Sequence, residues 1–349
     1  MGAGQEDQAR GAAVNQAELA RLTAWAARHV EGFAGPVRLT RFAAGQSNPT
    51  YRLETPGQSY VLRRQPPGLL LKGAHALDRE ARVMRALGAA GFPVPRVHAL
   101  CQDREVLGAW FYLMDFCAGR IFTRAQLEDV ARPERAGLFD AMNETLAQLH
   151  GLDPVALGLA DYGRAENYLP RQIARWGGQY REDELAGRDA AMDFLMDWLP
   201  SNLPPAQAAT IIHGDYRIDN LIFAPDAPRV AAVLDWELST LGDPLADFTY
   251  HLMMYRLGPE FPAGLAGTDL AAQGLPAEDA YIADYCRRTG RAGLVDLRFY
   301  LVFNMFRFAA ILHGIKGRLL RGNAASANAR AMADNFTPLA ALAARLARA

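Results

Sequence analysis

The sequence predicts an α+β fold of two lobes, a small antiparallel sheet followed by a larger, mostly helical lobe. Short runs of β-branched and aromatic residues, separated by Gly, Pro and Asn, fill residues 36–116. From residue 117 to residue 349 the sequence changes to long alanine- and leucine-rich helical patterns. Half of the 349 residues are hydrophobic, enough to bury a large core. We therefore expect a sheet lobe at 36–116 and a helical lobe at 117–349, preceded by a lead-in and one helix at 1–35.

The elements of the first lobe follow from local patterns. Apolar residues at helical spacing predict an amphipathic helix over residues 17–30. Five runs predict strands, the first three forming an antiparallel meander: VRLTRF (37–42), TYRLET (50–55), SYVLRR (59–64), VPRVHAL (94–100) and AWFYLMDF (109–116). One helix, AHALDREARVMRAL (74–87), is expected between the third and fourth strands.

Composition excludes several classes of protein. The 37 basic and 38 acidic residues give a formal net charge of −1, so no basic patch for nucleic acid is expected. Three cysteines, Cys101, Cys117 and Cys286, are widely spaced, which argues against a disulfide framework and favours the reducing cytoplasm. The apolar run 299–306 is interrupted by Asn304 and is too short to span a bilayer, so no membrane segment is expected.

The strongest chemical signal is the segment IIHGDYRIDNLIF. It places His213, Asp215 and Asn220 on one loop after an apolar strand, and a second apolar run delivers Asp235 fifteen residues later. Phosphoryl transfer needs a carboxylate at the attacking hydroxyl and oxygen ligands for Mg²⁺. Asp215 and Asn220 have the spacing that these two residue types have in protein kinases. The sequence therefore predicts a phosphoryl-transfer site.

The motifs HGDxxxxN and LDWE…GDPxxD, in this order, resemble the aminoglycoside phosphotransferase and choline kinase superfamily over residues 36–320. The segments VLRRQPPG, HGDYRIDN and DWELSTLGDPLAD are most similar to those of the kinase domain that accompanies acyl-CoA dehydrogenase domains in some larger proteins. The resemblance implies a protein-kinase-like two-lobed fold that binds ATP and Mg²⁺.

The resemblance also implies roles for individual residues. Asp215 would be the catalytic base, and Asn220 and Asp235 would be the metal ligands. His213 would orient the catalytic loop. Arg217 stands where protein kinases carry a lysine that meets the transferred phosphate.

Nucleotide-binding residues are expected in the first lobe. Where the family carries a lysine paired with a helix glutamate, this chain has Arg63, with Glu80 as the matching acid. The pair is either an ATP-phosphate clamp or an ordinary salt bridge. Backbone N–H groups near Gly45, Ser47 and Asn48 are expected to cover the phosphates, although this loop has one glycine rather than three.

Further residues are expected to support these groups. Asp115 and Cys117 lie where the two lobes connect, and their backbone groups are expected to meet the adenine edge. Asp243 and Asp247 are interpreted as caps of the helix that follows them. Glu237 is left open between a second metal ligand and a solvated side chain.

The sequence thus predicts an ATP- and Mg²⁺-dependent O-phosphotransferase acting on a hydroxyl group of a small molecule. The acceptor stays open between a hydroxyacyl thioester, an amino-alcohol and an aminoglycoside, and the oligomeric state is not predicted. The alternative is a nucleotide-binding pseudoenzyme, which the missing lysine favours and the three loop residues oppose. A flavin-dependent dehydrogenase is rejected, because no flavin fingerprint is present.

Overall fold

The structure is a computed structural model that describes residues 14–42, 48–66, 76–261, 263–322 and 329–349. The chain divides into two compact units. Unit 1 comprises Met1–Ala118 and Ala232–Glu237, and unit 2 comprises Gly119–Ala231 and Leu238–Ala349. Unit 1 holds a small antiparallel sheet and unit 2 is mostly helical, so the predicted fold class is confirmed.

The sheet of unit 1 has the order β1-β2-β3-β5-β4, and every neighbouring pair is antiparallel. Its strands are β1 Arg38–Arg41, β2 Thr50–Glu54, β3 Ser59–Arg64, β4 Val97–Cys101 and β5 Phe111–Asp115. All five lie within the predicted runs or extend them by one residue, and the first three form the predicted meander. In the register of β3 and β5, Arg63 lies opposite Tyr112, so their side chains share one face.

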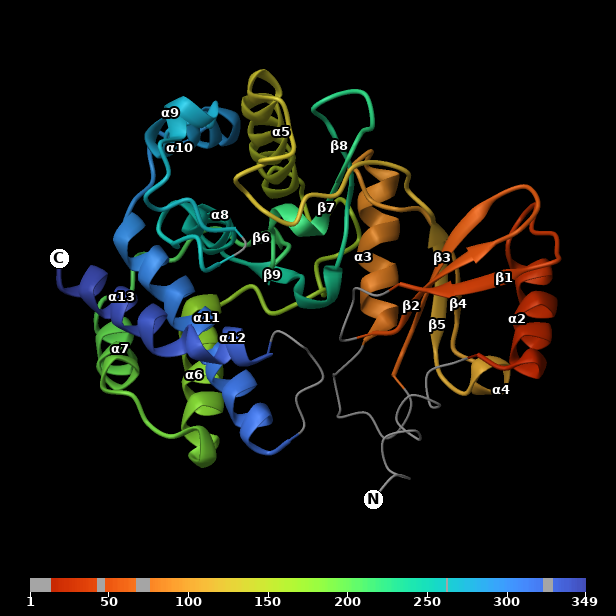
Figure 1. The fold of residues 1–349 in the computed structure, drawn as a ribbon, viewed down its shortest axis with the longest axis horizontal. Coiled ribbons are helices and arrows are strands. Elements are labelled where there is room, and N and C mark those ends of the chain that lie inside the picture. The colour runs from red at the N-terminus through yellow and green to blue at the C-terminus, as the bar shows by residue number, and fades with distance from the viewer. Residues whose placement is uncertain (1–13, 43–47, 67–75, 262, 323–328) are drawn as a thin grey trace. The chain divides into compact units, whose positions relative to one another are not determined.

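Two helices lie against opposite faces of this sheet, α2 (Gln16–His29) and α3 (Leu77–Ala89) (Figure 1). Trp25 of α2 is buried in the same apolar core as Phe111 of β5, and the short helix α4 (Arg104–Leu107) packs beside α2. The predicted lead-in at 1–35 therefore contributes a helix to the core of unit 1, because the apolar face of α2 needs the sheet to cover it.

The start of α2 is fixed by a capping box. The Asn15 side chain accepts a hydrogen bond from the Glu18 N–H, and the Glu18 carboxylate accepts one from the Asn15 N–H, both at 2.9 Å. Residues 1–13, which are part of the predicted lead-in, lie outside the described residues.

Unit 2 is built around the long helix α11 (Leu297–Leu320), most of whose residues are buried. Helices α6, α8, α12 and α13 pack against it. Besides α11, the helices of the unit are α5 Arg132–His150, α6 Tyr168–Glu182, α7 Ala190–Ser201, α8 Pro244–Leu252, α9 Leu270–Gln273, α10 Glu278–Thr289, α12 Ala329–Asp334 and α13 Phe336–Arg348, with 3₁₀ turns at Glu184–Ala186, Ile218–Asn220 and Met253–Tyr255. The 3₁₀ turn Trp236–Leu238 has its first two residues in unit 1.

Short strands lie at the centre of the motif region. β6 (Thr210–Ile212) pairs antiparallel with β9 (Thr240–Gly242), and β7 (Leu221–Phe223) pairs with β8 (Val230–Val233). The apolar run before Asp235 is thus a strand, as predicted.

The segment Ala232–Glu237 groups with unit 1, although it was predicted within the 117–349 lobe. The Val233 N–H donates to the Pro93 carbonyl at 2.8 Å, and the Trp236 ring meets the edge of Phe92. These contacts hold the Asp235 turn against unit 1.

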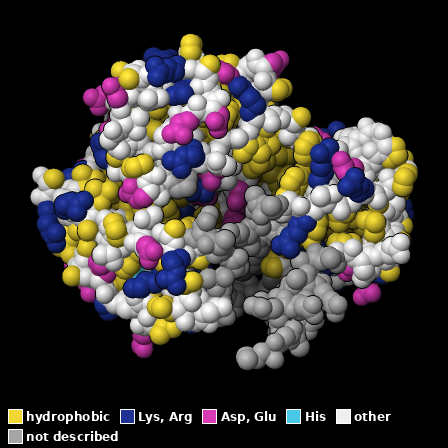
Figure 2. Space-filling model, viewed as in Figure 1, with side chains coloured by type: hydrophobic (Ala, Val, Ile, Leu, Met, Phe, Trp, Pro, Cys, Tyr) yellow, Lys and Arg dark blue, Asp and Glu magenta, His cyan; other side chains and the backbone are white. Residues whose placement is uncertain are grey.

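No helix among the described residues has the length and apolarity needed to cross a bilayer. On the face shown in Figure 2, basic and acidic side chains of the described residues are interspersed.

Candidate active site

The loop after β6 takes a conformation that only glycine allows at its second position. Gly214 has a φ of +82°, and a Cβ added there would lie 2.7 Å from the Leu238 carbonyl oxygen. The backbone can therefore turn sharply between the buried His213 ring and the Asp215 carboxylate.

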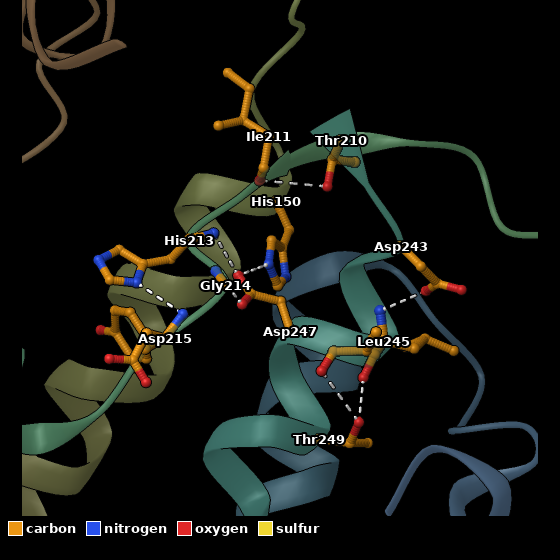
Figure 3. A network of polar contacts seen from close by, with 12 residues as sticks. His150, Thr210, Ile211, His213, Gly214, Asp215, Asp243, Leu245, Asp247 and Thr249 are labelled. Carbon is orange, nitrogen blue, oxygen red and sulfur yellow. Dashed lines mark hydrogen bonds and ion pairs between the residues drawn. The ribbon is translucent and has the colours of Figure 1, made fainter. Parts of the chain in front are cut away.

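Asp247 of α8 binds the backbone of this loop. Its fully buried carboxylate accepts hydrogen bonds from the backbone N–H groups of His213 at 2.7 Å and Gly214 at 2.8 Å, and His150 Nε2 lies 3.2 Å away (Figure 3). Burial acts to raise the pKa of Asp247, but the hydrogen bonds from the His150 side chain and from the His213 backbone N–H hold that pKa below its ordinary value. Asp247 therefore remains ionised and anchors the loop.

The two acids interpreted as helix caps differ in role. Asp243 is the N-cap of α8, since its side chain accepts from the Leu245 N–H at 2.9 Å. Asp247 lies one turn inside the helix and points to the loop instead, so its interpretation as a cap was wrong (Figure 3). One helix has one N-cap, and the second acid is free to bind elsewhere.

Both oxygens of the Asp215 carboxylate are engaged. Oδ1 accepts the Tyr250 hydroxyl at 2.6 Å and lies 3.3 Å from Arg217 Nε. Oδ2 accepts the Asn220 amide at 3.2 Å, and the same amide donates to the Asp215 carbonyl at 2.8 Å. His213 Nδ1 accepts the Asp215 N–H at 3.2 Å. The structure thus brings together the predicted loop residues of unit 2.

Tyr250 and Arg307 are site residues that the sequence reasoning did not identify. Arg307 is buried on α11, donates to the Gly214 carbonyl and lies 4.9 Å above the Tyr250 ring. Burial and the negative charge of Asp215 raise the pKa of Tyr250, which keeps its hydroxyl protonated as a donor. The available signal was helical spacing, because Tyr250 follows Asp247 by three residues on α8 and shares its face.

A small, partly open pocket of about 40 Å³ adjoins these residues in unit 2. Tyr250 and Arg217, the two side chains at Asp215 Oδ1, lie on its wall. Most of the rest is apolar: Ala125, Ile218, Met253, Met254, Leu257, Phe261, Ala263 and Phe308. None of the described residues that line it is acidic. The pocket therefore suits an apolar group next to the predicted base.

His251, also on the pocket wall, gives the stability of the protein a pH dependence. Burial lowers its pKa to about 4, and its Nε2 lies 2.7 Å from the Tyr281 hydroxyl. Between pH 6.5 and 4 the unfolded chain binds a proton that the folded protein refuses, so this group's contribution is present above pH 6.5 and is lost as the pH falls to about 4. We expect acidification over this interval to lower the free energy of unfolding by about 3 kcal/mol more in the parent than in His251→Gln.

Urea unfolding at several pH values measures the free energy of unfolding of the parent and of His251→Gln. The difference between the two proteins isolates His251, because Glu80 changes the stability of both in the opposite direction as the pH falls. Its pKa is raised to about 7, so its contribution is present below pH 4.5 and is lost as the pH rises towards 7. Identical pH slopes for parent and His251→Gln would contradict the assignment to His251.

In unit 1, Arg63 is held by three carboxylates. Its Nε lies 2.9 Å from Glu80, and its Nη2 donates to Asp235 at 2.8 Å and Glu237 at 3.2 Å. Asp235 has a φ of +65°, an uncommon backbone conformation that Asp tolerates better than most residues and that marks functional turns. The predicted pair of Arg63 and Glu80 is therefore formed, and Arg63 also pairs with the predicted metal ligand Asp235.

Glu80 is almost fully buried, and its other contacts come from the sheet side. Tyr112 donates to it at 3.0 Å and the Asn48 amide at 3.4 Å. Burial raises its pKa to about 7 against the opposing effects of Arg63 and the Tyr112 hydrogen bond, with Asp235 and Glu237 adding negative charge. Asn48, predicted in the phosphate loop, is thus a buried partner of Glu80.

The other residues predicted to bind the nucleotide lie in different places. Gly45 and Ser47 lie outside the described residues. Asp115 ends β5 and lies 2.6 Å from His98 Nε2. Burial and the charge of Asp115 raise the pKa of Cys117 to about 11, which keeps its thiol protonated.

The donor types fit a hard divalent cation. Asp235 and Glu237 offer carboxylate oxygens that are about one third exposed, at 32% and 31%, and Mg²⁺ prefers one or two carboxylates with the rest of its ligands from phosphate and water. In the part of the chain that the structure describes, no group of three or more His, Cys, Asp or Glu side chains is arranged to hold a metal alone. These carboxylates therefore fit a divalent metal whose remaining ligands come from phosphate and water.

The sequence profile of the phosphotransferase enzyme family matches residues 38–285. The chain belongs to this family. The resemblance inferred from the HGDxxxxN and LDWE motifs is therefore confirmed.

Relatives of this phosphotransferase include larger proteins. The chain is 44% identical over 298 residues to acyl-CoA dehydrogenase family member 10 of Mus musculus, covering 85% of this chain and 28% of that protein. It is 44% identical to acyl-CoA dehydrogenase family member 11 of Gallus gallus, covering 88% of this chain and 40% of that protein. It thus spans less than half of the curated relatives that it matches.

Solved structures share the fold. A Ralstonia eutropha protein provisionally named an aminoglycoside phosphotransferase is 47% identical with a TM-score of 0.86, over 94% of this chain and 98% of that chain. Choline kinase from Cryptosporidium parvum is 13% identical with a TM-score of 0.58, over 92% of this chain and 94% of that chain, which shows the fold alone.

Proposed function

We propose that this phosphotransferase transfers the terminal phosphate of ATP, with Mg²⁺, to a hydroxyl group on an apolar small molecule. The observation that carries the proposal is the position of Tyr250 and Arg217, which bind the Asp215 carboxylate and at the same time form the wall of an apolar pocket. An acceptor in this pocket would present its hydroxyl to the predicted base.

The pocket chemistry favours one of the open acceptor classes. An aminoglycoside carries several ammonium groups, which need acidic partners, whereas the described lining residues supply only Arg217 as a permanently charged group. A hydroxyacyl thioester offers an alkyl chain that Met253, Leu257 and Phe308 could cover. We therefore propose a hydroxyacyl compound as the acceptor.

The loop residues, Asp235 and Arg63 each have one task in the proposed reaction. Asp215 accepts the proton of the acceptor hydroxyl while the hydroxyl oxygen forms a bond to the γ-phosphorus of ATP. The bond between the γ-phosphorus and the oxygen that bridges it to the β-phosphate breaks, and ADP leaves. Arg217 would stabilise the charge on the transferred phosphoryl group. Asn220 and Asp235 would hold Mg²⁺, which, when bound, neutralises phosphate charge. Arg63 would contact the α- and β-phosphates.

The supporting groups act on the loop and not on the reactants. Asp247 fixes the backbone of His213 and Gly214, and Tyr250 orients the Asp215 carboxylate through the 2.6 Å hydrogen bond. The three free cysteines agree with the proposed cytoplasmic location.

The test is ADP release with Mg·ATP and a panel of hydroxyacyl thioesters, choline and an aminoglycoside. We expect turnover with hydroxyacyl thioesters, with kcat/KM rising about three- to fourfold per added methylene until the pocket is filled, because each buried methylene contributes about 0.8 kcal/mol. Chelation of Mg²⁺ should abolish turnover.

Two other results would each contradict part of the proposal. Preference for the aminoglycoside or choline would reject the apolar acceptor. A melting temperature raised by Mg·ATP without ADP release for any acceptor would favour the pseudoenzyme.

A further inference from the structure

Arg63 pairs with Asp235, the carboxylate proposed to bind the metal, and with the nearby carboxylate of Glu237. Its Nη2 donates to Asp235 Oδ1 at 2.8 Å and to Glu237 Oε2 at 3.2 Å, so the exposed side of the turn already has a counter-cation. We propose that Arg63 is the resident cation of Asp235 and Glu237 in the nucleotide-free protein, and that a divalent metal enters only with nucleotide phosphates that draw the guanidinium away. The proposal rests on the proposed metal role of Asp235.

Electrostatics opposes metal binding while Arg63 stays in place. A guanidinium is not deprotonated in proteins, so the competing charge is permanent. Like charges a few ångströms apart in a partly buried site repel each other, and a divalent ion doubles the repulsion that a single charge would feel. One of the two Asp235 carboxylate oxygens, Oδ1, is also already hydrogen-bonded to Arg63.

The contacts of Arg63 allow it to change partners without losing its anchor. Its Nε pairs with Glu80, whose side chain is 2% exposed, whereas Asp235 and Glu237 are 32% and 31% exposed. The buried pair can persist while Nη2 leaves the exposed carboxylates for a phosphate oxygen. The planar fork of Arg suits both arrangements, because it can bind a carboxylate and a phosphate through different nitrogens, whereas Lys acts as a point charge.

The experiment measures Mn²⁺ binding to the full chain by electron paramagnetic resonance of free Mn²⁺, first without nucleotide and then with AMP-PNP, after subtraction of the Mn²⁺ that the same AMP-PNP binds without protein. We expect the parent to bind Mn²⁺ at least tenfold more weakly alone than with AMP-PNP. The double variant Arg63→Gln/Glu80→Gln should bind Mn²⁺ alone at least tenfold more tightly than the parent. Its second substitution removes the buried carboxylate that loss of Arg63 would leave unpaired.

Arg64→Gln is the matched control. Arg64 is the next residue on β3, points to the opposite face of the strand and makes no ion pair with these carboxylates. The Arg64→Gln variant should bind Mn²⁺ with the affinity of the parent. This control shows whether the effect depends on the position of Arg63 or only on the loss of one positive charge.

Three outcomes overturn the proposal: equal Mn²⁺ affinity of parent and double variant, no binding to either, or unchanged binding when Asp235→Asn is added to the double variant. The measurement contains neither nucleotide hydrolysis nor acceptor. A failure to find an acceptor therefore leaves this result intact, and a failure here leaves the transfer assay to decide the proposed function.

Discussion

Replacing Asp215 with alanine is expected to lower kcat for the acceptor found by ADP release by a factor of about 10² to 10⁴, the usual contribution of a positioned general base. The reason is the position of its carboxylate, held by Tyr250 at 2.6 Å and Asn220 at 3.2 Å beside the apolar pocket. Steady-state kinetics at saturating acceptor gives kcat, and a thermal shift with Mg·AMP-PNP gives nucleotide binding, which should persist because the base acts on the acceptor.

Asp226→Ala is the control for this variant. Asp226 is an exposed acid in the turn between β7 and β8, so its loss changes the net charge by the same amount away from the loop. If Asp215→Ala turned over at the parent rate, the assignment of the base would be wrong. If it lost nucleotide binding as well, its role would be in the structure of the loop.

Local sequence patterns were sufficient for the strands of unit 1 but not for their order. SYVLRR matches β3 (Ser59–Arg64) residue for residue, because β-branched and aromatic composition with turn residues at both ends is a local property. The insertion of β5 between β3 and β4 depends on pairing between segments about 50 residues apart, for which no local signal exists. The short strand β9 was missed for the same reason.

Motif spacing predicted which residues gather on the loop, but not what holds them. Asp215, Arg217 and Asn220 lie within six residues on one turn, so spacing alone brings them together. Arg307 reaches the Gly214 carbonyl from a helix that begins more than 80 residues later, and only the tertiary fold makes that contact. The roles of these residues in catalysis remain predictions that the variants test.

The substitution with the largest expected effect on stability is Asp247→Ala. Its carboxylate is fully buried and receives the His213 and Gly214 N–H groups at 2.7 and 2.8 Å, with His150 at 3.2 Å. Removal leaves these donors buried without an acceptor, which should lower the free energy of unfolding by about 3–5 kcal/mol. Urea unfolding near pH 7 measures this loss. Asp247 is ionised at that pH, because its pKa is lowered, and its contribution to stability is lost only at pH values below about 3.8.

Asp269→Ala separates this role from helix capping. Asp269 is the N-cap of α9 and its exposed side chain accepts from the Ala272 N–H at 3.0 Å, so its loss should cost about 1 kcal/mol, as for an ordinary cap. A similar small cost for Asp247→Ala would mean that the loop keeps its conformation without the carboxylate. A large cost accompanied by loss of ADP release would show that one buried acid on α8 sets both the stability of unit 2 and the geometry of the Asp215 loop.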